Sequence, residues 1–191
     1  KMTKELAAQL INLAQSDICP EKIRPAIIDR LNSERLTRDE GEVAHFSLFI
    51  MAIDVRKKLV YIGHHKKSDK WIPHGGHIDA GELIEQTLVR EIWEEWGRRM
   101  TDGEIGAPVL LTITEIENPN LWPVCRRHYD IWYFVQVDKD TFTIDPEVLH
   151  GEFHEARWMG LEEASRLASD SPSVLEAYSL VSSNFFMDSQ L

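Results

Sequence analysis

The chain is poor in cysteine and in basic side chains. Its 191 residues include only two cysteines, Cys19 and Cys125, which lie far apart without paired spacing. We therefore expect two reduced thiols and a cytoplasmic protein. Lysine and arginine number 21 against 32 aspartates and glutamates, for a net charge of −11. This deficit argues against a nucleic-acid duplex or an anionic membrane surface as a partner.

Long apolar runs, signal-peptide features, internal repeats and low-complexity linkers are also missing from the sequence. We therefore expect no membrane-spanning segment and no secretory leader. The length is enough for one domain with a sizeable core and some extra elements.

What the sequence does contain is a glutamate-rich stretch from Gly75 to Gly97, GGHIDAGELIEQTLVREIWEEWG. Apart from Gly81, the part from about Ala80 to Trp96 lacks glycine and proline, so we expect a helix there. Asp79 is predicted to cap its start, and Gly97 to end it in a left-handed turn.

The predicted helix has two chemically different sides. Glu91, Glu94 and Glu95 are neighbours at i, i+3 and i+4, where like charges destabilise a helix. Hard divalent cations such as Mg²⁺ or Mn²⁺ prefer carboxylate oxygens and would neutralise this face. The alternative is an ordinary solvated acidic face. The other side carries Leu88, Val89, Ile92, Trp93 and Trp96, and its two tryptophans are predicted to lie in the core.

The spacing of these glutamates resembles the Nudix box, Gx5Ex7REUxEExGU, in which U is aliphatic. The matching positions are Gly76, Glu82, Arg90, Glu91, Ile92, Glu94, Glu95 and Gly97. Arg98 stands where the last aliphatic residue usually sits, and WIPHGG replaces the frequent Trp-x-x-Pro-Gly-Gly before the box. The resemblance implies a metal-dependent hydrolase of a nucleoside diphosphate derivative, a phosphate-bearing small molecule.

The resemblance also implies roles for individual residues. The metal ligands, which are also the catalytic carboxylates, would be Glu91, Glu94 and Glu95. Glu82 would complete their shell, partly through water, and the Gly76 carbonyl would reach a metal. Arg90 is predicted to hold neighbouring carboxylates in place.

Residues outside the box supply further candidates. Glu152 and Glu155, in an ExxExxW pattern ending at Trp158, are each predicted to be a general base, a further ligand or an ordinary carboxylate. A second set is predicted to bind substrate, with an exposed basic turn as the alternative. It comprises Arg126, Arg127 and His128 for phosphate, Trp122 for stacking on a base, and His74 and His77 for phosphate.

The whole pattern predicts an α/β fold, a Nudix-like α/β/α sandwich with a mixed sheet and an N-terminal helical extension. Strands are expected at 42–54, 59–64, 109–117, 128–138 and 152–159, and further helices at 3–15, 24–36, 161–168 and 172–183. The extension would span residues 1–41 and the Nudix domain residues 42–191. The apolar stripes of the extension are predicted to pack on the sandwich or across a homodimer, outside the metal site.

Two other functions stay open at this point. One is a non-catalytic Nudix-fold domain that senses or binds a ligand, which the intact carboxylates argue against. The other is an isoprenoid diphosphate isomerase, which would use a cysteine beside the site. Neither Cys19 nor Cys125 occupies a convincing position for that chemistry.

Overall fold

The computed structural model describes residues 4–40, 43–117 and 125–187. Its helices are α1 (Lys4–Gln15), α2 (Arg24–Asn32), η1 (Arg38–Glu40), α3 (Ile84–Trp96), α4 (Asp102–Ile105), α5 (Pro146–Glu152), α6 (Leu161–Leu167), α7 (Pro172–Val181) and η2 (Ser182–Phe186). Its strands are β1 (Ala44–Asp54), β2 (Leu59–His65), β3 (Lys70–Ile72), β4 (Leu110–Glu115), β5 (Arg127–Gln136) and β6 (Phe153–Gly160). Among the described residues, no helix is long and apolar enough to cross a membrane.

The strands form one mixed sheet, as the sequence predicted. The order is β3-β2-β1-β5-β4, with β6 paired to β2 on a separate path. β1 and β5 are parallel, and the other paired strands are antiparallel. β1 is buried along nearly its whole length, which explains its almost continuous apolar sequence.

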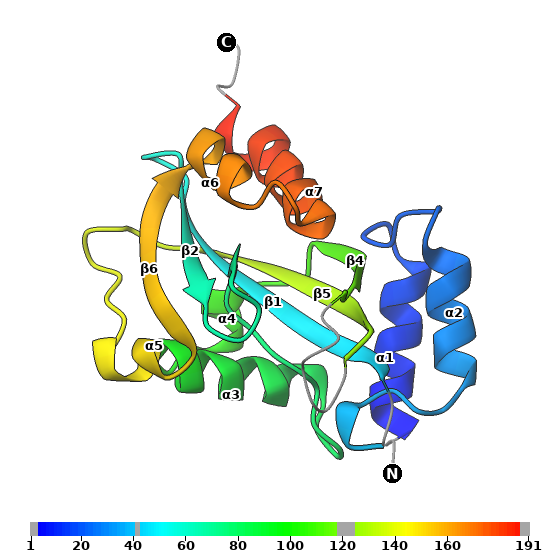
Figure 1. Ribbon diagram of the computed structural model, residues 1–191. Helices are drawn as coiled ribbons and strands as arrows, with labels where there is room; N and C mark the ends of the chain where they lie inside the picture. Colours follow the sequence, from blue (N-terminus) through cyan, green and yellow to red (C-terminus); the bar gives the residue numbers. More distant parts are fainter. Residues whose placement is uncertain (1–3, 41–42, 118–124, 188–191) are drawn as a thin grey trace.

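Helices cover both faces of the sheet, so the predicted α/β/α sandwich is confirmed. α3 and α5 lie on one face and α6 and α7 on the other, while α1 and α2 stand beside one end of β1 and β5 (Figure 1). Side chains of β1 alternate between two hydrophobic cores. Phe46 and Leu48 enter the core shared with α1 and α3, whereas Met51 and Ile53 enter the core under α6 and α7.

The N-terminal helices pack on the sandwich, the first of the two predicted alternatives. Leu6 and Leu10 of α1 and Ile27 of α2 are each 1% exposed and join the core that contains β1 and α3. Gln9 adds a polar link. Its amide oxygen accepts from the backbone N–H of Ile84 at 3.2 Å, and its amide nitrogen donates to Glu85 at 2.7 Å. α1 therefore satisfies part of the start of α3.

The box helix begins four residues later than predicted, and Asp79 does not cap it. α3 starts at Ile84, and the side-chain oxygen of Gln86 accepts from the backbone N–H of Leu83 at 2.8 Å. The preceding residues form a turn in which the Asp79 N–H donates to Glu82. The end agrees with the prediction, because Gly97 has a left-handed φ of 64°.

The prediction that Trp93 lies in the core is wrong. Val89 is 41% exposed and Trp93 is 52% exposed, with the guanidinium of Arg99 over the Trp93 ring. The cause is the rotation of α3, which turns Glu91 and Glu95 toward the sheet, where they are 7% and 4% exposed. Residues two positions before each glutamate then point to the opposite side of the helix.

Four short elements were not predicted from the sequence: η1, β3, α4 and α5. α5 matters for the site because it ends at Glu152, and its cap is conventional. The carboxylate of Asp145 accepts from the backbone N–H of Glu147 at 3.0 Å, and Pro146 follows as the first helical residue.

Candidate active site

The two glycines that open the box bring backbone against the carboxylates of α3. A Cβ atom at Gly76 would lie 2.3 Å from Oε1 of Glu91, so only glycine fits this position without displacing that side chain. Gly75 has a φ of 135°, and its N–H donates to Oε2 of Glu95 at 2.7 Å. The Gly76 carbonyl accepts from Leu48 N–H at 2.8 Å, so a metal contact would use its second lone pair.

Glu91 and Glu95 are carboxylic groups buried close together. Burial raises the pKa of Glu91 to about 7, although the Arg90 guanidinium opposes the shift. Burial, with the charge of Glu91 nearby, raises the pKa of Glu95 well above its ordinary value. Glu94 is different, because its side chain is 54% exposed. The site therefore combines two desolvated carboxyl groups with one open to solvent.

Arg90 holds these side chains and the box turn together. Its guanidinium donates to both carboxylate oxygens of Glu82 at 2.8 and 2.9 Å, to Glu91 at 2.7 Å and to Glu94 at 3.1 Å. A further bond, 2.9 Å long, reaches the backbone oxygen of His77. These bonds lower the pKa of Glu82 and raise that of Arg90. The contacts match the positioning role expected of this arginine.

Glu152 borders the same cluster from the end of α5. Its carboxylate lies 3.5 Å from Nε2 of His65 and 3.6 Å from Nζ of Lys67. The hydrogen bond with His65 is the main cause that lowers the pKa of Glu152 to about 2. Its negative charge contributes to the raised pKa values of Glu91 and Glu95, so the fold brings the two parts of the predicted site together.

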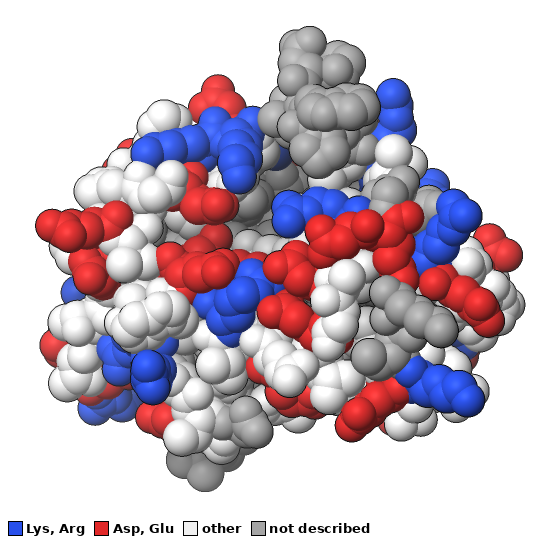
Figure 2. All heavy atoms as spheres, turned by 90° about the horizontal axis from the view of Figure 1, so that it is seen from below, with Lys and Arg blue, Asp and Glu red and all other residues white. Residues whose placement is uncertain are grey.

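This arrangement fits a hard divalent cation. Glu91, Glu94, Glu95 and Glu152 influence one another electrostatically, whereas the guanidinium of Arg90 contacts two of them. Buried carboxylates that repel one another are stabilised by a cation, and oxygen donors are the ligands that Mg²⁺ and Mn²⁺ prefer. Seen from the α3 side, acidic side chains gather over the middle of the face, beside basic side chains and a hollow (Figure 2).

The predicted substrate residues lie in different surroundings. Trp122 lies outside the described residues. Arg126 is exposed, while Arg127 forms a 2.6 Å ion pair with Glu115 on the neighbouring strand. The His77 ring lies against His128, with 3.1 Å between their Nε2 atoms.

His74 does not fit the predicted phosphate contact. Its ring is 1% exposed, stacks on Tyr61 and lies against the rings of Trp96 and Phe153. Burial lowers its pKa to about 3, which leaves a neutral imidazole enclosed by aromatic side chains. We correct this expectation: His74 is a core residue behind the box turn.

Some residues that shape the site were missed from the sequence. Gln9 supports the start of α3, and His65 and Lys67 contact Glu152. The polar run His64-His65-Lys66-Lys67 was a weak signal for the last two, since it precedes the box closely. Gln9 gave no signal, because its partners lie 75 and 76 positions away.

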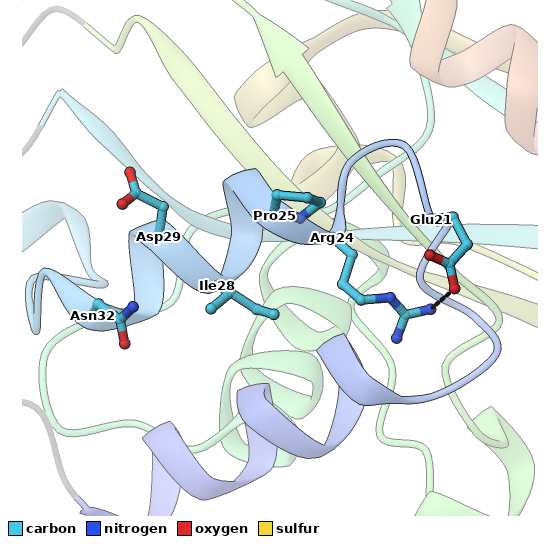
Figure 3. A pocket seen from close by; sticks show the side chains of 6 residues that line it. All are labelled: Glu21, Arg24, Pro25, Ile28, Asp29 and Asn32. Atoms are coloured by element: carbon cyan, nitrogen blue, oxygen red, sulfur yellow. Dashed lines mark hydrogen bonds and ion pairs between the residues drawn. The ribbon is translucent and has the colours of Figure 1, made fainter.

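A hollow of about 430 Å³ lies elsewhere, along α2, and does not resemble a catalytic site (Figure 3). Its lining residues are Glu21, Arg24, Pro25, Ile28, Asp29 and Asn32. The Arg24 guanidinium is already used by Glu21 and by the backbone oxygens of Ala14 and Cys19. These hydrogen bonds stabilise the turn between α1 and α2.

The fold is a mixed sheet between helices, and one helix holds a carboxylate cluster against a two-glycine turn. Together these features define a class of α/β sandwich proteins. The family model described as NUDIX domain matches residues 41–178, and the chain belongs to this family. The family resemblance drawn from the box is thereby confirmed.

Individual relatives agree with this assignment. The chain is 31% identical over 99 residues to the asymmetrical bis(5'-nucleosyl)-tetraphosphatase of Rattus norvegicus, covering 51% of this chain and 60% of that protein. It is 26% identical over 105 residues to the m7GpppN-mRNA hydrolase NUDT17 of Bos taurus, covering 52% and 34%. The chain thus matches less than two thirds of the length of both relatives.

A solved structure shows the same fold. The E. coli dihydroneopterin triphosphate pyrophosphohydrolase superposes with a TM-score of 0.56 at 16% identity, covering 71% of this chain and 92% of that one. The family model begins at residue 41, so α1 and α2 lie outside the part of the chain that it matches.

Proposed function

We propose that the protein hydrolyses a pyrophosphate bond in a nucleoside diphosphate derivative and depends on Mg²⁺, with Mn²⁺ as a substitute. The observation that carries this proposal is the pair of buried carboxyl groups, Glu91 and Glu95, held against the Gly75-Gly76 turn. The relatives named above act on nucleotide anhydrides, which supports the same reaction class.

The cation would be held by Glu91, Glu94 and Glu95, with Glu82 and the Gly76 carbonyl at its edge. When bound, it would supply charge neutralisation for the phosphate oxygens and activation of water. Arg90 keeps Glu82, Glu91 and Glu94 at fixed positions through its forked hydrogen bonds. In the absence of substrate, the same arginine offsets part of their mutual repulsion.

A carboxylate must accept the proton of the attacking water. Glu152 is poorly suited to this step because its pKa of about 2 makes it a weak base. Burial raises the pKa values of Glu91 and Glu95 in the metal-free protein, but a bound cation would lower the pKa of every carboxylate that holds it. The candidates for the base are therefore a box glutamate that the cation leaves free and Glu155, while Glu152, held by His65 and Lys67, would orient the water.

The substrate is a phosphate-bearing small molecule, and Arg126 is the better phosphate ligand of the two predicted arginines. It is exposed, whereas the Arg127 guanidinium is occupied by Glu115. Trp122 and His77 stay predictions for substrate contact. We also propose a cytoplasmic location, because Cys19 and Cys125 are both free thiols.

The alternative functions are less well supported. An isomerase would need a thiol at the carboxylates, but Cys19 is buried beside α2 and Cys125 lies against the rings of His45 and His77. A ligand sensor has no need for crowded carboxyl groups whose burial costs stability. The intact cluster therefore favours catalysis.

The test is a panel of nucleoside diphosphate sugars, dinucleoside polyphosphates and nucleoside triphosphates, each assayed with Mg²⁺, with Mn²⁺ and with a chelator. We expect cation-dependent turnover of at least one class, and a loss of roughly a hundredfold or more in Glu95→Gln. Glu162→Gln, on exposed α6 surface, removes the same charge and is the matched control. Turnover that survives chelation, or near-normal rates in Glu95→Gln at saturating Mg²⁺, would contradict the proposal.

A further inference from the structure

Four side chains outside the carboxylate cluster converge on one point. His45, His77, Cys125 and His128 each offer one nitrogen or sulfur atom, and these atoms all lie within 4.8 Å of one another. They come from three parts of the chain. His45 and His128 are register partners on β1 and β5, Cys125 lies two residues before the start of β5, and His77 lies in the box turn.

The cluster lies on the other face of the sheet from the carboxylates. Residues 74–78 pair with β1 through bridges at Ser47 and Ile50, so their side chains alternate between faces. The Gly76 position faces Glu91, and His77 therefore points away from α3. Two residues along β1 on the same side as His45, Ser47 donates to Asp130. These four side chains are thus separate from the carboxylate cluster, and a metal-ligand role for His77 replaces its predicted contact with substrate phosphate.

We propose that His45, His77, Cys125 and His128 bind a single zinc ion. A tetrahedral site with usual bond lengths places two nitrogens about 3.3 Å apart, and a nitrogen and a sulfur about 3.6 Å apart. The Nε2 atoms of His77 and His128 are 3.1 Å apart. The Cys125 sulfur lies 3.7 Å from Nε2 of His45 and 3.9 Å from Nε2 of His77. These distances are close to the edges of such a tetrahedron.

The ligand types select the metal. Imidazole nitrogen and thiolate sulfur suit zinc, whereas Mg²⁺ and Mn²⁺ prefer the oxygens found on α3. His45 is fully buried, and the other three side chains are half-buried, so the cluster is enclosed but open to entry of an ion. Cys125 must lose its thiol proton on binding, because the thiolate is the ligand.

One contact has to change when the metal binds. A nitrogen of the Arg38 guanidinium lies 3.4 Å from Nδ1 of His77, which makes Nδ1 an acceptor in the metal-free form. With Nε2 on zinc, Nδ1 carries the hydrogen and this long contact is lost. Arg38 retains Asp79, which lies 3.6 Å from its guanidinium.

Four protein ligands leave no open position on a tetrahedral ion, so the site would be structural. It would fasten the start of the box, at His77, and the chain at Cys125 to the β1–β5 pair. The zinc ion would thereby cross-link the backbone of the turn whose other side faces the carboxylates, and would limit the movement of that turn. This role is independent of the reaction proposed for α3.

The experiment uses the full chain, stripped with a chelator and titrated with Co²⁺ as a spectroscopic stand-in for Zn²⁺. We expect one equivalent to bind with a thiolate-to-cobalt charge-transfer band and the intense visible bands of tetrahedral coordination, both abolished by Zn²⁺. Cys125→Ser should lose the charge-transfer band and bind Zn²⁺ at least about a hundredfold more weakly. Cys19→Ala and the double variant Glu94→Gln/Glu95→Gln should keep the band, as controls for the other thiol and for the carboxylates.

A measurement on the unaltered protein keeps the proposal testable if Cys125→Ser does not fold. Zn²⁺ should slow alkylation of Cys125 at least about tenfold, as followed by mass spectrometry of the peptide that contains it. Adventitious binding only, meaning weak uptake that is the same in all variants, would overturn the proposal. So would a charge-transfer band that persists without Cys125 or disappears with the glutamates.

Discussion

Replacing Glu91 with glutamine should stabilise the metal-free protein at pH 8. The glutamine keeps the size of the side chain and mimics the protonated carboxyl group, while it removes a charge that is 7% exposed. The pKa of Glu91 is raised from 4.5 to about 7, mainly by burial. At about 1.4 kcal/mol per pKa unit, the charged form costs about 3 kcal/mol of folding free energy above pH 7.

The sign of the pH dependence follows from the direction of the shift. Because the folded pKa lies above the unfolded one, the contribution of Glu91 to stability is fully present below pH 4.5. It is lost as the pH rises through about 7. The advantage of the glutamine variant should therefore grow from nearly nothing at pH 4.5 to about 3 kcal/mol at pH 8.

Magnesium should remove this advantage. At a hundred times its dissociation constant, a ligand that binds only the folded state adds about 2.7 kcal/mol. The wild-type protein should gain this amount, whereas Glu91→Gln should gain little, because an amide is a poor ligand for a hard cation. The free energies of unfolding of the two proteins should then be nearly equal.

Urea unfolding at pH 5, 6, 7 and 8, with chelator and with Mg²⁺, measures all of these quantities. Glu162→Gln provides the control, since it removes an exposed charge on α6. The reasoning is refuted if the difference between wild type and Glu91→Gln is the same at pH 5 and pH 8, or if Mg²⁺ leaves it unchanged.

Three other substitutions probe neighbouring parts of the structure. Arg90→Ala should lower the free energy of unfolding, measured with urea, by about 2 to 4 kcal/mol, because Glu82 and Glu91 lose their partner. Arg90→Lys should restore only part of the lost stability. Full restoration would mean that the positive charge alone matters and that the forked hydrogen bonds do not. Gly76→Ala should weaken Mg²⁺ binding, measured by calorimetry, at least about tenfold, because the added Cβ would displace the Glu91 side chain. An unchanged affinity would show that the position of Glu91 beside Gly76 does not matter for the metal. Leu10→Ala should cost about 2 to 5 kcal/mol of stability but leave kcat unchanged, and a large fall in kcat in the folded variant would place α1 at the substrate site.

The spacing of the box glutamates was enough to predict the family, the helix and the carboxylate cluster. It was not enough to predict how the helix is rotated. Hydrophobic periodicity placed Trp93 on the same side of the helix as Ile92 and Trp96, and therefore in the core. The structure buries Ile92 and Trp96 but exposes Trp93, because the helix also turns Glu91 and Glu95 inward, and periodicity does not represent buried carboxyl groups.

Contacts between distant parts of the chain were also beyond sequence reasoning. Cys125 and His45 lie 80 positions apart, and each is unremarkable in its own stretch. β1, which carries His45, and β5, which begins two residues after Cys125, were predicted to within a few residues, but their parallel pairing and register were not. A pattern within one element gives its type and its exposed side, whereas the partner across the sheet depends on the topology of the whole fold.

The parallel pairing of β1 with β5 has a consequence for the synthesis of the protein. Register partners on these strands, such as Ser47 and Asp130, are separated by 83 positions in the chain. At the usual rates of translation, about 5 to 20 residues per second, β5 is made roughly 4 to 17 s after β1. During that time one edge of an almost wholly apolar strand has no native partner. The nascent chain should therefore need chaperones more than its size suggests. A chain whose synthesis stops before β5 should be prone to aggregate after its release from the ribosome.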